Sequence, residues 1–281
     1  MTPAPHPGSS VTLPRSEWWD MCAGDDPARR HRILLAWPEQ PPPPGGFPVL
    51  FLTDGNATFA TAADALRARS WRGAAEDIAP ALIVGLGHPG TAAFDIPSRM
   101  RDYTPPVAEA QQGSGGADAF LDFIEAELLP ELERRFPVDR ARLALFGHSF
   151  GGLLALHALF TRPGLFRRLV AASPSLWWAG GATMEAARHF AAAPPPGTGN
   201  SALLITVGEL EGQDDAGNPR AAIRAARRMA GNARDLATLL AGAWPAVDFV
   251  SFPGEKHGSV IPAAIARALP FTLPPDPGAA P

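Results

Sequence analysis

The chain of 281 residues contains one cysteine, one lysine and one tyrosine. A single thiol, Cys22, excludes an intramolecular disulfide and every site built from several thiolates, including structural zinc and iron–sulfur centres. No uninterrupted apolar run approaches the roughly 18 to 20 residues that a membrane-spanning helix needs, so we expect no membrane partner. The residues after Met1 show neither a basic start nor an apolar stretch of signal-peptide length. We therefore expect a cytoplasmic protein.

The chain also carries little net charge. The 24 basic and 28 acidic residues leave a net charge of −4, which gives no long-range field that attracts nucleic acid. The length suits one large α/β domain. We predict a single domain over residues 1–281, with flexible tails at about 1–15 and 273–281.

Short β-rich runs alternate with amphipathic stretches, a pattern typical of a mostly parallel sheet with helices on both faces. The predicted strands are Arg32–Trp37, Val49–Leu52, Ala81–Gly85, Arg142–Phe146, Leu169–Ala172, Leu203–Val207 and Val247–Phe252. We expect the first two to form an antiparallel edge. The predicted helices are Asp118–Phe136, capped by Asp118 and kinked at Pro130, one after Gly151, and two at about Pro219–Ala241 and Val260–Leu269.

One motif carries a specific chemistry. The strand Arg142–Phe146 leads directly into Gly147-His-Ser149-Phe-Gly151, and a helical pattern follows at once. This is the strand, G-x-S-x-G, helix arrangement of a nucleophile elbow, in which glycines let the strand and helix approach while the serine hydroxyl projects above the sheet. Ser149 is the predicted nucleophile, whereas the adjacent His148 is predicted to be a non-catalytic filler.

A hydrolase of this fold places its acid and histidine after later strands. His257 follows the last predicted strand and is the predicted base. The loop after Val207 holds several carboxylates. An offset of three residues from the strand-ending glycine favours Glu211 as the acid, with Glu209 and then Asp215 as alternatives.

The oxyanion donors follow from the same logic. The N–H of Phe150 should provide one, because it follows the nucleophile at a helix N-terminus. The Thr53-Asp-Gly-Asn56 turn should provide the second, through the N–H of Asn56, unless it is a simple strand-ending turn. A G-x-G-x-x-G match at Gly85–Gly90 lacks the helical pattern that a dinucleotide site requires. We therefore expect no dinucleotide site there, and the sequence predicts no metal site.

The segments together resemble the esterase D-like branch of the α/β-hydrolases, and within it the siderophore esterases that open the trilactones of enterobactin and salmochelin. The resemblance covers most of the chain. It rests on Phe47–Ala57, Ile83–Pro89, Arg99–Pro105, Leu145–Gly152, Ala172–Trp178 and Gly208–Glu211. The Arg-x-x-Asp-Tyr-Thr-Pro and Ser-Pro-Ser-x-Trp-Trp elements are narrower than the Gly-His-Ser and Asp-Gly elements that the whole branch shares.

The resemblance implies hydrolysis of an ester or lactone, without a cofactor, on a small-molecule substrate such as a ferric siderophore. Arg99 would contact an anionic catecholate or orient the carbonyl, or else form a structural ion pair. Trp177 and Trp178 would line an aromatic pocket or pack the loop after a strand. Some members work with a weakened or absent acid, which leaves the role of Glu211 open but not those of Ser149 and His257.

The sequence therefore predicts an α/β-hydrolase fold and a serine carboxylic-ester hydrolase that opens siderophore trilactones or related catechol esters through an acyl-enzyme. A general carboxylesterase or feruloyl-type esterase and an acyltransferase on the same fold are the alternatives, since mycolyltransferases also resemble this branch. A binding protein without catalysis is disfavoured by the intact Ser149 and His257.

Overall fold

The computed structural model describes residues 11–70, 78–109, 111–213, 219, 221–244 and 246–275. An eight-stranded sheet runs through them in the order β1-β2-β4-β3-β5-β6-β7-β8. The strands are β1 (Ser16–Cys22), β2 (Arg30–Ala36), β3 (Phe47–Thr53), β4 (Leu82–Gly87), β5 (Val138–His148), β6 (Arg168–Ala172), β7 (Ala202–Gly208) and β8 (Val247–Phe252). From β4 to β8 every pairing is parallel. This is the α/β-hydrolase architecture that the sequence predicts.

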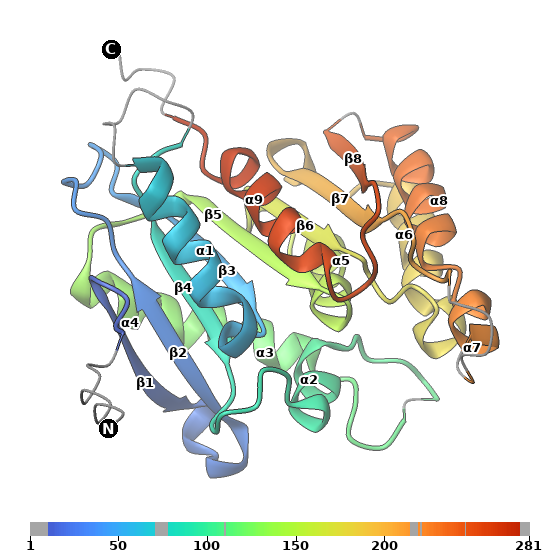
Figure 1. The fold of residues 1–281 in the computed structure, drawn as a ribbon, viewed down its shortest axis with the longest axis horizontal. Coiled ribbons are helices and arrows are strands. Elements are labelled where there is room, and N and C mark those ends of the chain that lie inside the picture. The colour runs from blue at the N-terminus through green and yellow to red at the C-terminus, as the bar shows by residue number, and fades with distance from the viewer. Residues whose placement is uncertain are drawn as a thin grey trace, which may run out of the picture.

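Helices cover both faces of the sheet (Figure 1). They are α1 (Gly55–Ser70), α2 (Ile96–Tyr103), α3 (Ala117–Phe123), α4 (Leu129–Arg135), α5 (Phe150–Thr161), α6 (Ala182–Ala192), α7 (Ala221–Ala226), α8 (Met229–Ala241) and α9 (Val260–Thr272). One face carries α1 and α9, while α3, α4, α5, α6 and α8 lie on the other, behind the sheet in Figure 1. No helix within the described ranges is both long enough and apolar enough to span a bilayer.

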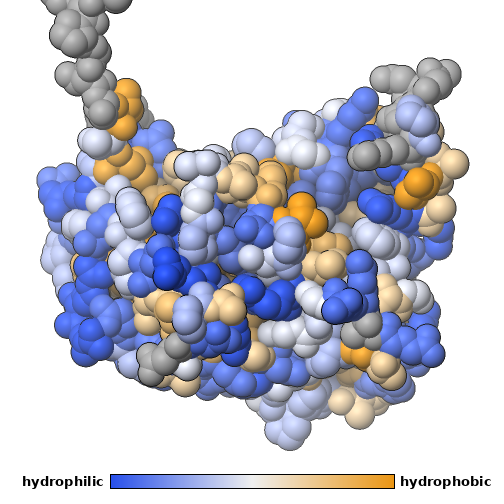
Figure 2. All heavy atoms as spheres, turned by 90° about the horizontal axis from the view of Figure 1, so that it is seen from below, coloured by the Kyte–Doolittle hydropathy of each residue, from blue (hydrophilic) through white to orange (hydrophobic). Residues whose placement is uncertain are grey.

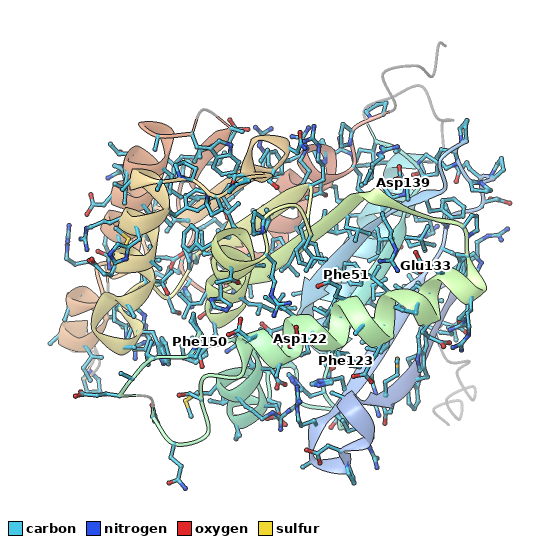
Figure 3. All side chains as sticks on the ribbon, turned by 180° about the vertical axis from the view of Figure 1, so that it is seen from behind. Phe51, Asp122, Phe123, Glu133, Asp139 and Phe150 are labelled. Carbon is cyan, nitrogen blue, oxygen red and sulfur yellow. The ribbon has the colours of Figure 1, made fainter. Side chains whose placement is uncertain are left out.

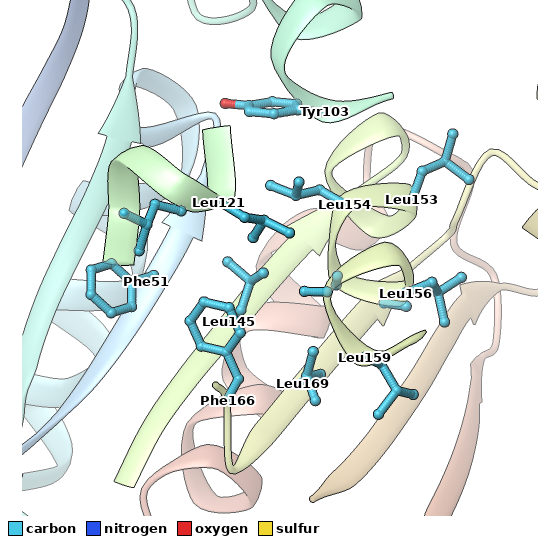
Figure 4. Close-up of a cluster of buried hydrophobic side chains, with 14 of the residues drawn as sticks. Phe51, Tyr103, Leu121, Leu145, Leu153, Leu154, Leu156, Leu159, Phe166 and Leu169 are labelled. Atoms are coloured by element: carbon cyan, nitrogen blue, oxygen red, sulfur yellow. The ribbon is translucent and has the colours of Figure 1, made fainter. Parts of the chain in front are cut away.

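Alternation along the buried strands divides the core in two. Leu50 and Leu52 of β3 face the α1 and α9 layer, whereas Val49 and Phe51 face the opposite layer, because successive side chains of a strand point to opposite faces. The larger cluster, part of which is drawn in Figure 4, joins Phe51 and neighbouring strand residues to α3 and α5. The two packed layers hold the carboxyl ends of the strands in fixed register.

Two of the strand predictions need correction. The strand β1 falls in a stretch for which no strand was predicted, because an edge strand has no fully buried face, and its Trp18 is 60% exposed. The expected antiparallel pairing of the first two predicted strands is wrong. The β2 strand pairs antiparallel with β1 and β4, and the crossover through α1 inserts β4 between β2 and β3.

The predicted helix Asp118–Phe136 exists, with changes. A π-helical turn, Ile124–Leu128, separates α3 from α4, immediately before Pro130, which has no N–H to continue the helical ladder. Asp118 does not cap the helix, since Gly116 is the N-cap and the Asp118 carboxylate bonds to His157 instead. The predicted helix at Pro219–Ala241 is broken at Arg228, whose φ is 46°.

Two segments that were expected to be irregular are ordered in the structure. The stretch after the Gly85–Gly90 match was expected to lack a helix, yet α2 begins at Ile96, with Asp95 as its N-cap accepting from the Ser98 N–H at 2.9 Å. The predicted C-terminal tail starts too early, because Leu273 is fully buried and its carbonyl accepts from Ala79 N–H. Residues 1–10 and 276–281 of the predicted tails lie outside the described residues.

A buried polar cluster ties β2 to the loop after β4 and to α2. Asp102 accepts from His88 Nε2 at 3.0 Å and from Nε and Nη2 of Arg101. His31 lies beside this carboxylate, with its Nδ1 at 3.7 Å from Asp102 Oδ2. Burial lowers the pKa of His31 to about 4, since desolvation outweighs the attraction of Asp102. His31 is therefore neutral at pH 7.

Acid should weaken the fold through His31. The unfolded chain binds this proton near pH 6.5 and the folded chain only near pH 4, so the contribution is complete above about pH 6.5 and is lost as the pH falls toward 4. The largest loss from this group is roughly 3 kcal/mol of unfolding free energy. Urea titrations at pH 7.5 and 5 should show a smaller difference for His31→Gln than for the unaltered chain. The exposed control His189→Gln should not reduce that difference, and equal behaviour of the two variants would contradict the assignment.

Candidate active site

The site lies where the chain changes direction within the sheet. After β3 the chain crosses to β4 on one side, and after β5 it crosses to β6 on the other. A crevice forms at the carboxyl ends of strands that diverge in this way. Figure 3 shows Asp139 near the start of β5 and Phe150 just beyond its other end. The predicted nucleophile Ser149 occupies the turn between β5 and α5.

The Ser149 turn is sharp. Its φ of 61° and ψ of −112° lie outside the regions that side-chain-bearing residues ordinarily adopt. A Cβ on Gly147 would lie 1.9 Å from the Gly151 carbonyl oxygen, and one on Gly151 would lie 2.1 Å from Thr53 Oγ1. Both glycines are therefore required by contact, as the G-x-S-x-G pattern predicts, and they hold the serine above the strand ends.

The structure brings the three predicted triad residues together. His257 Nε2 lies 3.2 Å from Ser149 Oγ, and His257 Nδ1 lies 2.8 Å from Glu211 Oε2. A carboxylate only accepts, so the proton of a neutral imidazole resides on Nδ1 and Nε2 is free to accept from the serine. The Glu211 side chain is fully buried, whereas that of His257 is 45% exposed. This geometry suits removal of the serine proton.

The carboxylates that competed with Glu211 lie elsewhere. Glu209 accepts from the Gly254 N–H at 3.2 Å, and Asp215 lies outside the described residues. The second oxygen of Glu211 accepts from the Gly208 N–H at 2.8 Å and from the Ser173 hydroxyl. The offset of three residues thus has a physical basis, because the carboxylate folds back onto the glycine that ends β7.

Two serines of the Ser-Pro-Ser motif belong to the site although the sequence analysis gave them no role. Ser173 orients Glu211, and Ser175 Oγ lies 3.0 Å from Ser149 Oγ. Ser175 is 2% exposed, and its N–H donates to the Ser149 carbonyl. Their position after β6, the strand next to the nucleophile strand, is the signal that would have found them.

A cavity of about 720 Å³ opens beside the triad. Phe150 and Trp177 line it together with Ser149, Ser175 and His257. The part of the prediction that concerns Trp178 is corrected, because Trp178 is 5% exposed and packs in the core. Figure 2 looks onto the molecule from below the view of Figure 1 and shows a largely hydrophilic face with small, separate hydrophobic areas.

Arg99 forms the structural ion pair that the sequence left open. Its Nε and a terminal nitrogen donate to the two Asp54 oxygens at 2.6 and 3.1 Å, and Arg99 is 6% exposed. Burial raises the pKa of Asp54 while the guanidinium lowers it. The hydroxyl of the only tyrosine, Tyr103, accepts from the Asp54 N–H. The Arg-x-x-Asp-Tyr motif thus fixes the turn after β3, and Arg99 Nη2 also donates to the His148 carbonyl.

The oxyanion predictions remain predictions. Phe150 is the first residue of α5, where the first-turn amides of a helix have no partner within it. Asn56 lies in the first turn of α1. Its side chain serves the β4 loop, donating to the carbonyls of His88 and Ala92 at 3.0 and 3.1 Å. Any oxyanion contact from Asn56 must therefore come from its backbone N–H.

The buried histidines His31, His88 and His148 lie outside the proposed triad. The ring of His148 lies 4.5 Å from that of His257, and burial, with a smaller effect of His257 and the Arg99 guanidinium, holds the pKa of His148 well below its usual range. Within the described residues, His31, His88 and Asp102 offer ligand atoms within 4.8 Å of one another. The Arg101 guanidinium on both Asp102 oxygens opposes a cation there.

These features define a serine hydrolase of the α/β-hydrolase fold. Residues 26–244 match a family model described as a putative esterase. The chain belongs to this esterase family and is a serine esterase.

Curated relatives extend over nearly the whole chain. It is 34% identical to the ferri-bacillibactin esterase BesA of Bacillus subtilis, covering 95% of this chain and 93% of that protein. It is 37% identical to the siderophore triacetylfusarinine C esterase of Aspergillus fumigatus, covering 92% and 93%. Among solved structures, the siderophore hydrolase EstB from Aspergillus nidulans is 33% identical, with a TM-score of 0.83 over 96% of this chain and 98% of that chain.

Replacement of the acid should separate the carboxylates after β7. Glu211→Gln should lower kcat roughly 10²- to 10⁴-fold, because an amide cannot stabilise the imidazolium that forms on His257. Glu209→Gln is the matched control, and its kcat should change far less. Steady-state hydrolysis of p-nitrophenyl acetate measures both. A larger loss for Glu209→Gln would require the acid to be reassigned.

Replacement of Arg99 should lower the stability of the fold. Arg99→Met leaves the buried Asp54 without its partner and should lower the unfolding free energy by about 3–5 kcal/mol. The control Arg188→Met breaks an exposed pair with Glu185, for which about 0–1 kcal/mol is expected. Urea denaturation followed by circular dichroism compares them. Equal stability of the two variants would show that the buried pair does not hold this turn.

Proposed function

We propose that Ser149, His257 and Glu211 are the catalytic triad of a carboxylic-ester hydrolase. The observation that carries the proposal is the continuous relay from Glu211 Oε2 through the His257 ring to Ser149 Oγ, with distances of 2.8 and 3.2 Å, beside a cavity of about 720 Å³. Nucleophile, base and orienting acid lie in the order and geometry that acyl transfer requires.

In this mechanism, His257 Nε2 removes the Ser149 proton while Oγ attacks the ester carbonyl. The N–H groups of Phe150 and Asn56 receive the developing oxyanion, aided by the N-terminus of α5. The imidazolium then protonates the leaving alcohol, and an acyl-enzyme remains. Water, activated by the same histidine, releases the acid.

The substrate that we propose is a siderophore ester or trilactone. Support comes from the relatives whose names include siderophore substrates and from the size of the cavity, which admits more than a simple acetyl ester. A cytoplasmic setting stays a prediction, which cell fractionation tests. Hydrolysis rates with apo and ferric enterobactin, a feruloyl ester and p-nitrophenyl acetate separate a siderophore esterase from a general one.

Loss of the nucleophile should abolish activity. Ser149→Ala should lower kcat by roughly 10⁶-fold, because serine and histidine act as one unit. It should also end covalent labelling by a fluorophosphonate. The control Ser114→Ala, whose hydroxyl donates to the Gln111 carbonyl and which is not among the residues lining the cavity, should keep both properties. A purified Ser149→Ala protein that retains more than a tenth of the activity would refute the mechanism, and an unlabelled parent protein would favour a non-catalytic binding protein.

A further inference from the structure

The cavity beside the triad has a cationic wall that the catalytic mechanism does not use. Arg224, Arg227 and Lys256 line it, from two segments far apart in the sequence. Arg227 follows α7, and Lys256 precedes the proposed base His257 in the loop after β8. Lys256 is the only lysine of the chain.

Arg227 is held in place by an aromatic ring. Its guanidinium carbon lies 4.0 Å from the centroid of the Trp177 ring, and Trp177 lies 6.3 Å from the ring of Phe150. A guanidinium stacked on an aromatic face keeps its in-plane N–H donors free for an anion. The stacked Arg227 is therefore pre-organised as a donor at the cavity wall.

Among the described lining residues, negative charge does not offset Arg227 and Lys256. Glu211 is the only carboxylate among them, and its fully buried side chain is engaged by His257, Ser173 and Gly208. Within the part of the chain that the structure describes, no carboxylate pairs with Arg227 or Lys256. The unpaired charges among the described lining residues are thus those of Arg227 and Lys256.

We propose that Arg227 and Lys256 form an anion-binding subsite that selects the iron-loaded form of a catechol ester over its metal-free form. This proposal rests on the esterase function proposed above. It moves the anion contact from Arg99, which is committed to Asp54, to two cations that face the cavity.

The charge of the ligand supplies the selection. Metal-free catechol hydroxyls keep their protons near neutral pH, whereas a ferric ion displaces them. Three doubly negative catecholates outweigh one ferric ion, so the complex carries net negative charge. The apolar rim formed by Ile96 and Ile223, 55% and 57% exposed, suits the aryl rings. The relatives include a ferri-bacillibactin esterase and an apo-salmochelin esterase, so likeness alone does not choose between the two forms.

The test compares kcat/KM for ferric and apo enterobactin in Arg227→Gln, Lys256→Gln and the double variant. Each single change should lower the ferric-to-apo ratio about threefold to tenfold, and the double change about 10- to 100-fold. The KM for the ferric ester should rise between about 0.05 and 0.5 M NaCl in the parent protein, and this rise should be weaker in the double variant, because salt screens exposed charges.

The matched control is Arg228→Gln. Arg228 is the next residue along the chain and pairs with Asp235 on the surface at 3.4 Å, so it removes the same charge outside the cavity and should leave the ratio at the parent value. Arg227→Lys should restore part of the ratio through charge alone. A double variant whose ratio stays within about threefold of the parent, while the parent hydrolyses both esters, overturns the subsite and leaves the esterase function standing. A parent protein that cleaves neither enterobactin nor p-nitrophenyl butyrate overturns the proposed function, and the subsite with it.

Discussion

The close approach of β5 and α5 is the constraint on which the site depends. A Cβ on Gly147 would clash with the Gly151 backbone, and a Cβ on Gly151 would clash with Thr53 at the end of β3. This contact forces Ser149 to a φ of 61° and raises its hydroxyl above the sheet. Strain of this kind persists only where surrounding packing determines it, and the two-sided core provides that packing.

Charged groups around the site fall into two sets with different physical roles. Arg99, Asp54 and Asp102 are almost fully buried and are paired with one another or with neighbouring histidines and arginines. Removing one partner from such a set leaves an uncompensated charge, which is why they act on stability. Arg227 and Lys256 face the cavity instead, where solvent moderates the cost of an unpaired cation and an incoming anion gains from it.

The two narrower motifs on which the family resemblance rests also have different structural roles. The Arg-x-x-Asp-Tyr motif builds the wall behind the nucleophile, through Arg99 to Asp54 and Tyr103 to the backbone of the same turn. The Ser-Pro-Ser motif contacts the proposed triad, through Ser173 to Glu211 and Ser175 to Ser149. The proposed catalytic centre is thus supported from β3 and β6, the two neighbours of β5 in the sheet.

The sequence alone was sufficient for local features. Buried apolar runs predict seven of the strands, and G-x-S-x-G between a strand and a helix predicts the Ser149 turn, because both depend on neighbouring residues. The glycine offset likewise selects Glu211. Only the tertiary structure decided what depends on distant partners. In it, β4 lies between β2 and β3, and Arg99 is buried against Asp54, 45 residues away in the sequence. Trp178 packs in the core, whereas Trp177 lines the cavity. Adjacent tryptophans are chemically identical and have the same intrinsic propensities. Which of the two is buried therefore depends on the segments that pack against them, and the local sequence pattern does not determine it.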